Sequence, residues 1–476
     1  MLFNSLRFIL FFLIVVFMYY VLPKKMQKLW LLLCSYFFYC LWNPAYVILL
    51  LISTAVTYCA GALIEKINKP SEKKLVVAFA AIINFCMLGY FKYCQFFVDT
   101  VRMLFSRIGI DTSMPEFSII LPVGISFYIF QSFTYIIDIY RGDVESEKSI
   151  ISYALFVSFF PNILSGPIEK SKHFLPQLKE DKTFDYNRMK SGALLMLWGY
   201  FLKVVVCDRM SLLVDTVFDN YKNYGGIVVI VAALFFSFQI YFDFAGYSAL
   251  ASGAAEILGF NLIRNFNQPY FADSVADFWR RWHISLSTWF KEYLYFPLGG
   301  SRKGKLKKSV NVLIVFLVSG LWHGASWHFV VWGIINGALQ VLGGFIKPFK
   351  RCRVARIILT FILMTIAWVF FRASGIVPAI LMIKSMVTGF DINAFTSGAL
   401  LELALDIKDY IVVILSLIIV AAVDIANEKG YFVRKELMKK NICIQWLIYL
   451  IAIFAVLIFG VYGPEFITAN FLYFKF

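Results

Sequence analysis

Long apolar segments separated by short polar ones recur from Phe8 almost to the end of the chain. Each segment has about 17–25 residues, enough for a helix to cross the ~30 Å hydrocarbon core of a membrane. Of the 476 residues, 61% are hydrophobic and 16% are charged, whereas soluble domains have about 45–50% apolar and about 25% charged residues. Because lipid offers the backbone no hydrogen-bond partners, such segments fold as helices. We predict an all-α, polytopic protein of the cell membrane, with one domain over residues 1–476.

The net charge of +16 is carried mainly by short basic loops between the apolar segments. Basic loops of this kind lie on the cytoplasmic side of membrane proteins and contact anionic lipid. We therefore expect membrane lipids, and not nucleic acid, as the partner of these charges. The loops are residues 66–74, 302–308, 347–356 and 434–440.

The eight cysteines are scattered, mostly within apolar segments, and none forms a C-x-x-C pair. This pattern is typical of small buried side chains rather than of disulfides or metal ligands. We predict no metal site.

Three of the four histidines fall between residues 277 and 332, within or beside strongly apolar segments: His283, His323 and His328. An ionisable residue at membrane depth is costly, so it marks a functional site by default. This region therefore holds the first candidates for catalysis.

His323 is placed by the two basic loops that flank its apolar segment. If residues 302–308 and 347–356 are both cytoplasmic, the chain between them rises and returns as a hairpin. Its ascending arm, residues 309–322, has about 14 residues and a length of ~21 Å, which puts His323 past the middle of the bilayer, at the turn. Desolvation there favours the neutral imidazole that a general base requires.

Structural roles are the alternative for each histidine. His323 could form a hydrogen bond between helices, as polar residues do in membrane proteins. The small residues Gly320 and Gly324 around it, which leave room for a substrate, favour the functional role. We expect His328 to be structural, and for His283 the sequence alone favours neither role.

Residues 274–295 read as one amphipathic helix at the membrane interface, with tryptophans beside basic residues. Arg280 and Arg281 could contact lipid phosphates, or they could hold an anionic donor such as the phosphates of coenzyme A. A polar patch that includes Asn265 precedes this helix.

Two further polar features remain open at this point. Asp243 could orient an imidazole, or it could cap a helix beginning near Ala245. Residues 150–167 are apolar but broken by Pro161 and Gly166. They form either a re-entrant segment that presents Asn162, Ser165 and Glu169 to a cavity or a plain helix followed by a surface loop.

Several motifs together resemble the membrane-bound O-acyltransferase family, and within it the alginate O-acetylase branch. The likeness covers nearly the whole chain and is most specific over residues 265–332. The motifs are LPVGISFY at 121–128, YFDFAGY at 241–247, DFWRRWH at 277–283, PLGG at 297–300 and LWHGA at 321–325.

The resemblance implies a ring of roughly 10–13 transmembrane helices, with re-entrant segments, around a funnel whose thin floor holds the reaction site. It implies a catalytic core at about residues 120–346. His323 corresponds to the family's catalytic histidine and His283 to its second histidine, where some distant members have Asn or Asp. Arg280, Arg281, Trp279 and Asn265 are the expected donor-binding residues, and Asp243, Trp322 and Ser319 are the expected supporting residues.

The function implied is transfer of an acetyl group from a cytosolic thioester, acetyl-coenzyme A, with no permanently bound cofactor. The acceptor would be a hydroxyl of an extracytoplasmic polysaccharide or of a periplasmic or extracellular acetyltransferase partner. D-alanyl transfer to teichoic acid is an alternative with the same chemistry. A solute transporter is an alternative of another class, but it predicts paired internal repeats, which the sequence lacks.

Overall fold

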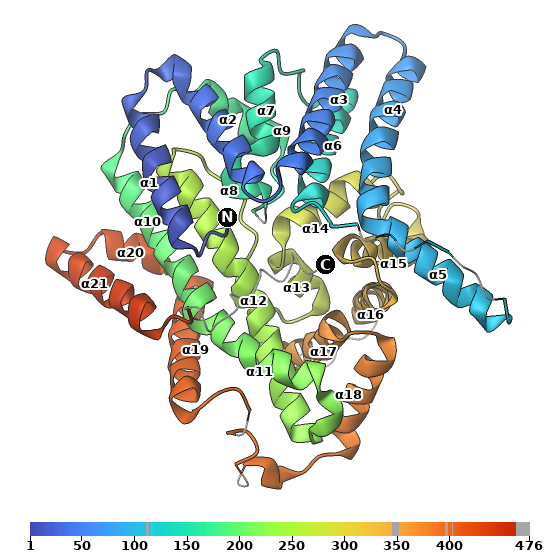
Figure 1. The fold of residues 1–476 in the computed structure, drawn as a ribbon, viewed down its shortest axis with the longest axis vertical. Helices are drawn as coiled ribbons and strands as arrows, with labels where there is room; N and C mark the ends of the chain where they lie inside the picture. The colour runs from blue at the N-terminus through green and yellow to red at the C-terminus, as the bar shows by residue number, and fades with distance from the viewer. Residues whose placement is uncertain are drawn as a thin grey trace. The chain divides into compact units, whose positions relative to one another are not determined.

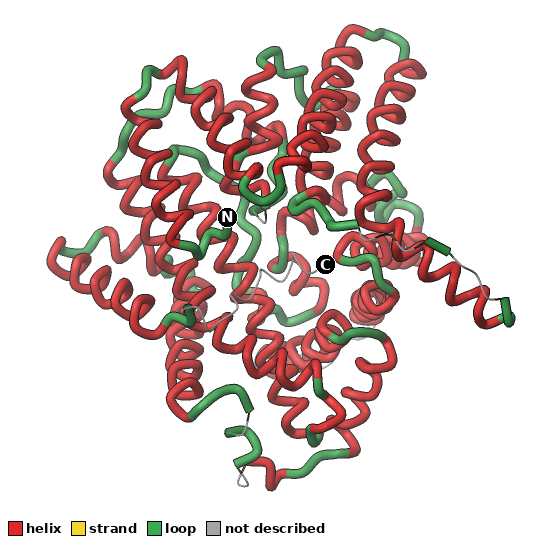
Figure 2. The backbone as a smooth tube through the Cα atoms, in the orientation of Figure 1, coloured by secondary structure: helices red, strands yellow, loops and turns green. Residues whose placement is uncertain are grey.

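The computed structural model describes residues 1–110, 114–115, 117, 119–164, 166–344, 352–395, 398–401 and 403–462. Over these residues the chain consists of helices and loops, without strands (Figure 2). The predicted all-α class is confirmed. Ser165 and part of the basic loop at 347–356 lie outside the described residues.

The chain divides into two compact units, Met1–Gly192 with Ala251–Ile263, and Ala193–Leu250 with Arg264–Phe476. Two helices contribute to both units, α10 (Tyr186–Tyr200) and α12 (Gly226–Ile257). The first unit also contains α1 (Leu6–Val21), α2 (Lys24–Cys40), α3 (Val47–Lys66), α4 (Pro70–Leu88), α5 (Cys94–Arg107), α6 (Ile125–Arg141), α7 (Ile150–Ser158), α8 (Phe160–Ile163) and α9 (Ser171–Lys179).

The second unit holds all the candidate site residues, and its helices are labelled in Figure 1. They are α11 (Asp208–Asp219), α13 (Val275–Arg281), α14 (Ile284–Phe290), α15 (Gly304–His323), α16 (Trp327–Gly343), α17 (Arg353–Arg372), α18 (Ile376–Thr388), α19 (Ile407–Glu428), α20 (Val433–Met438) and α21 (Ile442–Phe459).

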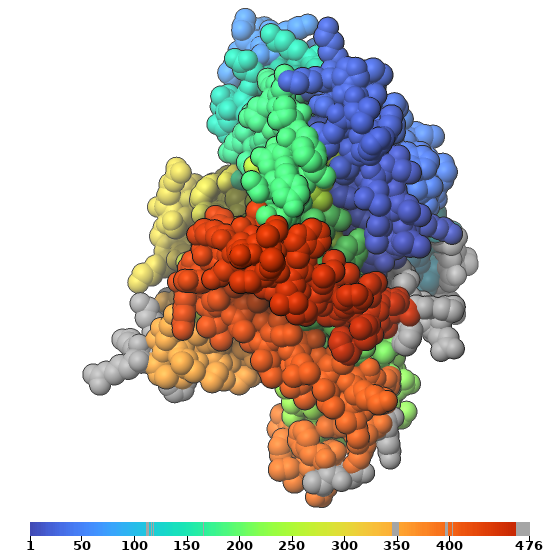
Figure 3. Space-filling model, turned by 90° about the vertical axis from the view of Figure 1, so that its left-hand side faces the viewer, coloured from blue at the N-terminus to red at the C-terminus, as the bar shows by residue number. Residues whose placement is uncertain are grey.

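Eight helical spans among the described residues are long and apolar enough to cross a membrane, and four shorter apolar helices accompany them. The least buried of the eight is α21, whose large apolar side chains, among them Leu447, Ile451 and Phe454, are exposed. Figure 3 shows α21, in red, on the surface. An apolar helix exposed along its length suits contact with lipid, as a polytopic membrane protein requires.

The helix over residues 150–167 is interrupted, as its proline and glycine predict. Helix α7 ends at Ser158, and the four-residue α8 follows. The polar groups of this region bond within the first unit: Asn162 Nδ2 donates to Gln131 Oε1 at 3.2 Å, and Glu169 Oε1 accepts from the Ile263 amide at 2.6 Å. These bonds satisfy polar groups that would otherwise be costly to bury.

Helix α5 continues through Arg107. The helix follows α4 through a π-helical turn at Gly89–Tyr93, and its apolar residues Phe97 and Leu104 are exposed.

Helices α15 and α16 form the predicted hairpin, and they cross at two glycines. A Cβ atom on Gly320 would lie 2.3 Å from the Phe329 carbonyl oxygen, and one on Gly333 would lie 2.3 Å from that of Phe316. Small residues let the backbones of membrane helices approach this closely. The crossing places His323, the last residue of α15, at the turn, as the sequence predicts.

The hairpin provides a test of this packing. We expect Gly333→Ala to destabilise the protein by about 1–3 kcal/mol, since an added methyl group must push the two backbones apart. Gly343→Ala, at the end of the same helix and with no atom within 4 Å of the new Cβ, should change stability by no more than about 0.5 kcal/mol. Thermal unfolding in one detergent compares the variants; equal midpoints would show that the crossing tolerates a larger residue.

Candidate active site

His323 and His283 both contact the same indole ring, that of Trp322. The ring of Trp322 is 5.0 Å from that of His323 and 6.0 Å from that of His283, centroid to centroid, and both contacts are edge-to-face. Both imidazoles are buried, with 4% and 1% of their residue surface exposed. The structure thus brings the two candidate catalytic residues together around Trp322.

Aromatic rings enclose His323 on further sides. The ring centroid of Trp332 lies 5.0 Å away and that of Phe371 5.4 Å away, both edge-to-face. Ser319 is buried one helical turn before His323, so it shares that face of α15. This apolar enclosure excludes bulk water from around the imidazole.

His283 lies at a sharp break where a continuous helix was expected. The predicted helix over 274–295 is instead α13 and α14, separated by Trp282 and His283. His283 has a φ angle of +43°, in the left-handed region, and Gln268 is the other non-glycine residue with a positive φ in the described chain. Such backbone is strained and persists only where the surroundings fix it.

Burial also determines the charge of His283. Its ring is 4.5 Å from that of Phe244, edge-to-face, and burial lowers the pKa of the imidazole to about 3, because desolvation disfavours the charged form. His283 is therefore neutral at neutral pH, which suits a polar group that orients or polarises a substrate better than a strong base.

Asn265 fixes the strained turn from the opposite segment. Its backbone oxygen accepts from the Ile284 amide at 2.9 Å, and its side-chain oxygen accepts from Ser285 Oγ at 2.7 Å. Its Nδ2 donates to Ser248 Oγ on α12 at 3.1 Å. Asn265, expected to contact the donor, therefore holds the His283 turn against α12.

The structure excludes one of the two roles that the sequence left open for Asp243. Helix α12 continues unbroken from Gly226 to Ile257, so Asp243 caps no helix. Its Oδ1 instead lies 2.6 Å from Lys203 Nζ, which is also 2.8 Å from Asp208 Oδ1. All three residues are buried. Pairing offsets the cost of burying these charges, and it holds α12 against the π-helical turn Phe201–Cys207.

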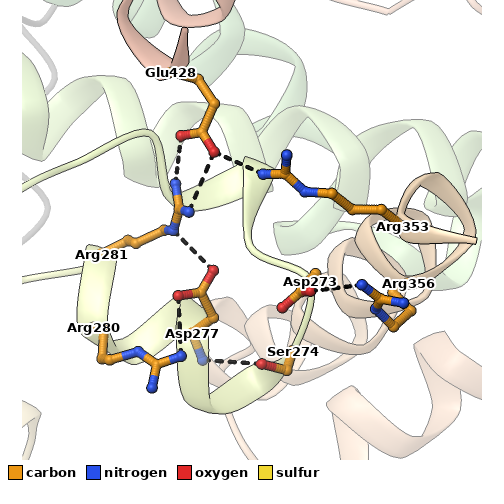
Figure 4. A network of polar contacts seen from close by, with 8 residues as sticks. All are labelled: Asp273, Ser274, Asp277, Arg280, Arg281, Arg353, Arg356 and Glu428. Atoms are coloured by element: carbon orange, nitrogen blue, oxygen red, sulfur yellow. Dashed lines mark hydrogen bonds and ion pairs between the residues drawn. The ribbon is translucent and has the colours of Figure 1, made fainter. Parts of the chain in front are cut away.

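The two arginines differ in their exposure and partners (Figure 4). The side chain of Arg280 is 72% exposed and pairs only loosely with Asp277, at 3.2 Å. That of Arg281 is 17% exposed and pairs with Asp277 at 2.9 Å and with Glu428 at 2.6 Å. Arg280 is therefore the more accessible of the two for an anionic ligand.

Trp279 is packed inside rather than presented at the surface. It is 9% exposed, and its ring lies 5.3 Å from Phe316 and 5.7 Å from Trp332. Because Trp332 contacts His323, Trp279 forms part of the aromatic wall around that residue.

Comparison with known proteins identifies the family of the chain. A model of the membrane-bound O-acyltransferase family matches residues 144–377. A probable alginate O-acetylase of Pseudomonas syringae pv. tomato is 36% identical over 384 residues, which are 79% of this chain and 73% of that protein. This chain belongs to the membrane-bound O-acyltransferase family. It is accordingly a multi-pass membrane O-acyltransferase, for which the acyl donor is a substrate and not a permanent cofactor.

Two other relatives show the range of the family. A peptidoglycan O-acetyltransferase of Helicobacter pylori is 35% identical over 425 residues, covering 81% of this chain and 80% of its own length. A teichoic acid D-alanyltransferase of Bacillus subtilis is 25% identical over 279 residues, covering 55% of this chain and 70% of its own length.

Sequence reasoning missed three residues of this candidate site. Lys203 is a charged residue inside an apolar segment. Such residues are usually paired and have a structural or functional role, so the sequence could have identified Lys203 as a candidate. Phe244 and Phe371 contact the histidines, but one phenylalanine among 51 carries no mark in the sequence.

The turn that holds His283 can be tested by truncating Asn265. We expect Asn265→Ala to cost about 1–3 kcal/mol, because the hydroxyls of Ser248 and Ser285 lose a buried partner, and to lower acyl transfer per folded molecule. Ser285→Ala, which leaves the bond between Asn265 and Ser248 in place, should have the smaller effect on both. Thermal unfolding and transferase assays of the same preparations measure this; full activity per folded Asn265→Ala molecule would contradict it.

Proposed function

We propose that this enzyme transfers an acetyl group from cytosolic acetyl-coenzyme A to a hydroxyl on the other side of the membrane. The acceptor is an extracytoplasmic polysaccharide or the active-site hydroxyl of a partner acetyltransferase that completes the transfer. The observation that carries the proposal is that His323 and His283 both contact Trp322. His323 lies at the turn of a hairpin between two predicted cytoplasmic loops.

The relatives support acetyl over D-alanyl transfer. The two O-acetylating relatives are 35–36% identical and cover 79–81% of this chain. The D-alanyltransferase is 25% identical and covers 55%. The acceptors in the names of the acetylating relatives, alginate and peptidoglycan, are both polysaccharides, which supports a polysaccharide here.

In the proposed step His323 acts as the general base. A ring nitrogen takes the proton of the acceptor hydroxyl while the hydroxyl oxygen attacks the thioester carbonyl carbon. The carbon–sulfur bond then breaks, and the coenzyme A thiolate takes the proton back from the imidazolium. The ester forms and the thiol leaves, so protons balance and no other reactant is required. The neutral imidazole of His283 polarises or orients the same centre.

Water exclusion supports this assignment. The rings of Trp332 and Phe371 beside His323 limit the access of water, which would otherwise hydrolyse the thioester in place of the acceptor. Low local polarity also strengthens hydrogen bonds to the charge that develops on the carbonyl oxygen.

Donor binding on the cytoplasmic side is assigned mainly to Arg280. Its guanidinium is exposed, and the fork of an arginine matches phosphate oxygens in pairs. Arg281, predicted as a second phosphate contact, has its three nitrogens engaged by carboxylates.

The catalytic role of His323 is tested in cells that carry the gene. We expect His323→Ala to abolish acetylation of the surface polymer at an unchanged protein level, since no other group in the site replaces the base. His328→Gln is the matched control: His328 lies in the same hairpin, and its Nδ1 is 2.8 Å from Ser326 Oγ, a local contact that we interpret as structural. Mass spectrometry of the polymer measures the acetate.

Acetate retained by the His323→Ala cells would remove this residue from the mechanism. If the polymer of these cells lost D-alanine instead of acetate, the proposed chemistry would stand, but the transferred group would be D-alanyl and not acetyl.

The donor is tested by direct binding. We expect purified protein in lipid nanodiscs to bind radiolabelled acetyl-coenzyme A, and Arg280→Gln to weaken binding about ten-fold, the value of a charge-assisted hydrogen bond. Lys439→Gln removes a similarly exposed charge, 69% against 72%, from another predicted cytoplasmic loop and should leave binding unchanged. Equal losses in both variants would indicate a general charge effect rather than a phosphate contact.

A further inference from the structure

Glu428 is the last residue of α19, and it joins three helices of the second unit (Figure 4). Its Oε2 lies 2.6 Å from Arg281 Nη1, and its Oε1 accepts from Arg281 Nη2 at 3.3 Å. The same Oε1 lies 2.8 Å from Arg353 at the start of α17. One carboxylate thus ties the end of α13 to two membrane helices.

Arg281 is held on its remaining side as well. Its Nε donates to Asp277 Oδ2 at 2.9 Å, one turn earlier in α13. Its backbone oxygen accepts from the Asn267 amide at 3.0 Å. With two carboxylates on the side chain and a backbone bond on the carbonyl, both the direction and the position of this residue are fixed.

The fixed residue lies two positions before His283. On the other flank of the strained turn the Ile284 amide donates to Asn265. The carbonyl oxygen of His283 accepts from the Ser287 amide at 2.9 Å, in the first turn of α14. Its left-handed backbone conformation is strained, so the residues on both flanks must hold it in place. One flank is the Asn265 network, and the other is Arg281.

We propose that Glu428, through Arg281, is a positioning residue for His283. The expected effect on catalysis rests on the proposed function. The expected effect on the conformation of the His283 turn does not. Arg281 then belongs to the scaffold of the site and not to the donor-binding surface. The Arg281–Glu428 pair, which we call the clamp, spans 147 residues of sequence and couples the end of α19 to the turn that carries the second histidine.

Partial burial suits the clamp to this task. The side chains of Arg281 and Glu428 are 17% and 20% exposed, so the pair is only partly screened by solvent. The pairing is also forked, which adds geometric specificity to attraction. A lysine at position 281 would keep the charge but lose the fork.

The test compares Glu428→Gln with Asp273→Asn. Asp273, just before α13, forms a neighbouring ion pair with Arg356 of α17 at 2.9 Å. In Figure 4 no bond joins Asp273 to Arg281. Both variants remove one carboxylate charge from the same region and keep the shape of the side chain. They differ in whether the clamp is broken.

The first measurement is hydrogen exchange of the purified protein in nanodiscs, which needs no substrate. We expect Glu428→Gln to accelerate exchange in peptides covering residues 280–287, because the turn loses one flank. Asp273→Asn should leave exchange there unchanged. Equal protection in Glu428→Gln and the natural protein, or equal acceleration in both variants, overturns the proposal.

The second measurement is the transfer of label from acetyl-coenzyme A to polymer in inverted membrane vesicles. We expect Glu428→Gln to lower kcat roughly 10- to 100-fold, since small displacements of catalytic groups have effects of that size, with the KM for acetyl-coenzyme A within about two-fold. Arg281→Lys should show the same division between kcat and KM. A raised KM with unchanged kcat would mean that Arg281 binds the donor, and it would overturn the positioning role.

The two measurements separate the two proposals. If vesicles with the natural protein transfer no label, the proposed function fails, while hydrogen exchange still decides whether the clamp holds the turn. Should Glu428→Gln not fold, Glu428→Asp, which retains the charge at a shorter reach, gives the same comparison with a smaller expected change.

Discussion

Burying a charged group in so apolar a chain is costly unless another part of the chain supplies an opposite charge, and that requirement organises the second unit. Lys203 meets Asp243 and Asp208, so α12 is fixed against the π-helical turn before α11. The next residue, Phe244, then contacts His283, and Ser248, one turn on, holds Asn265. The position of the second histidine follows from polar pairs that are made elsewhere along α12.

Lipid simplifies some predictions from sequence. Because it permits little but apolar helices, the spans could be located from composition, and the basic loops on either side located the turn of the α15–α16 hairpin. His323 was placed at that turn for this reason, and α15 does end there. The sequence also predicts that Arg280 and Arg281 lie in a tryptophan-rich helical segment. The structure has two short helices there, α13 and α14, instead of the one expected helix.

What could not be predicted depends on pairings between distant residues. Asp243 had two plausible local roles, and its Oδ1 proved to pair with Lys203, 40 residues away in an otherwise apolar segment. Arg281 looked available for a phosphate until Glu428, at the end of another helix, was seen beside it. Such choices depend on how helices pack, and a periodic pattern along one helix does not contain that information. The left-handed turn at His283 has the same origin, because backbone strain is held by contacts and not by local preference.

The left-handed backbone at position 283 has a consequence for how this position can vary during evolution. Asparagine and aspartate are, after glycine, the residues that most readily adopt a positive φ, and the family resemblance implies that some distant members have them at this position. An exchange between histidine and asparagine would therefore alter the chemistry of the site without refolding the turn that carries it. The backbone conformation therefore limits the residue types that position 283 tolerates. Within that limit, the second polar group of the site can change while the conformation of the turn stays the same.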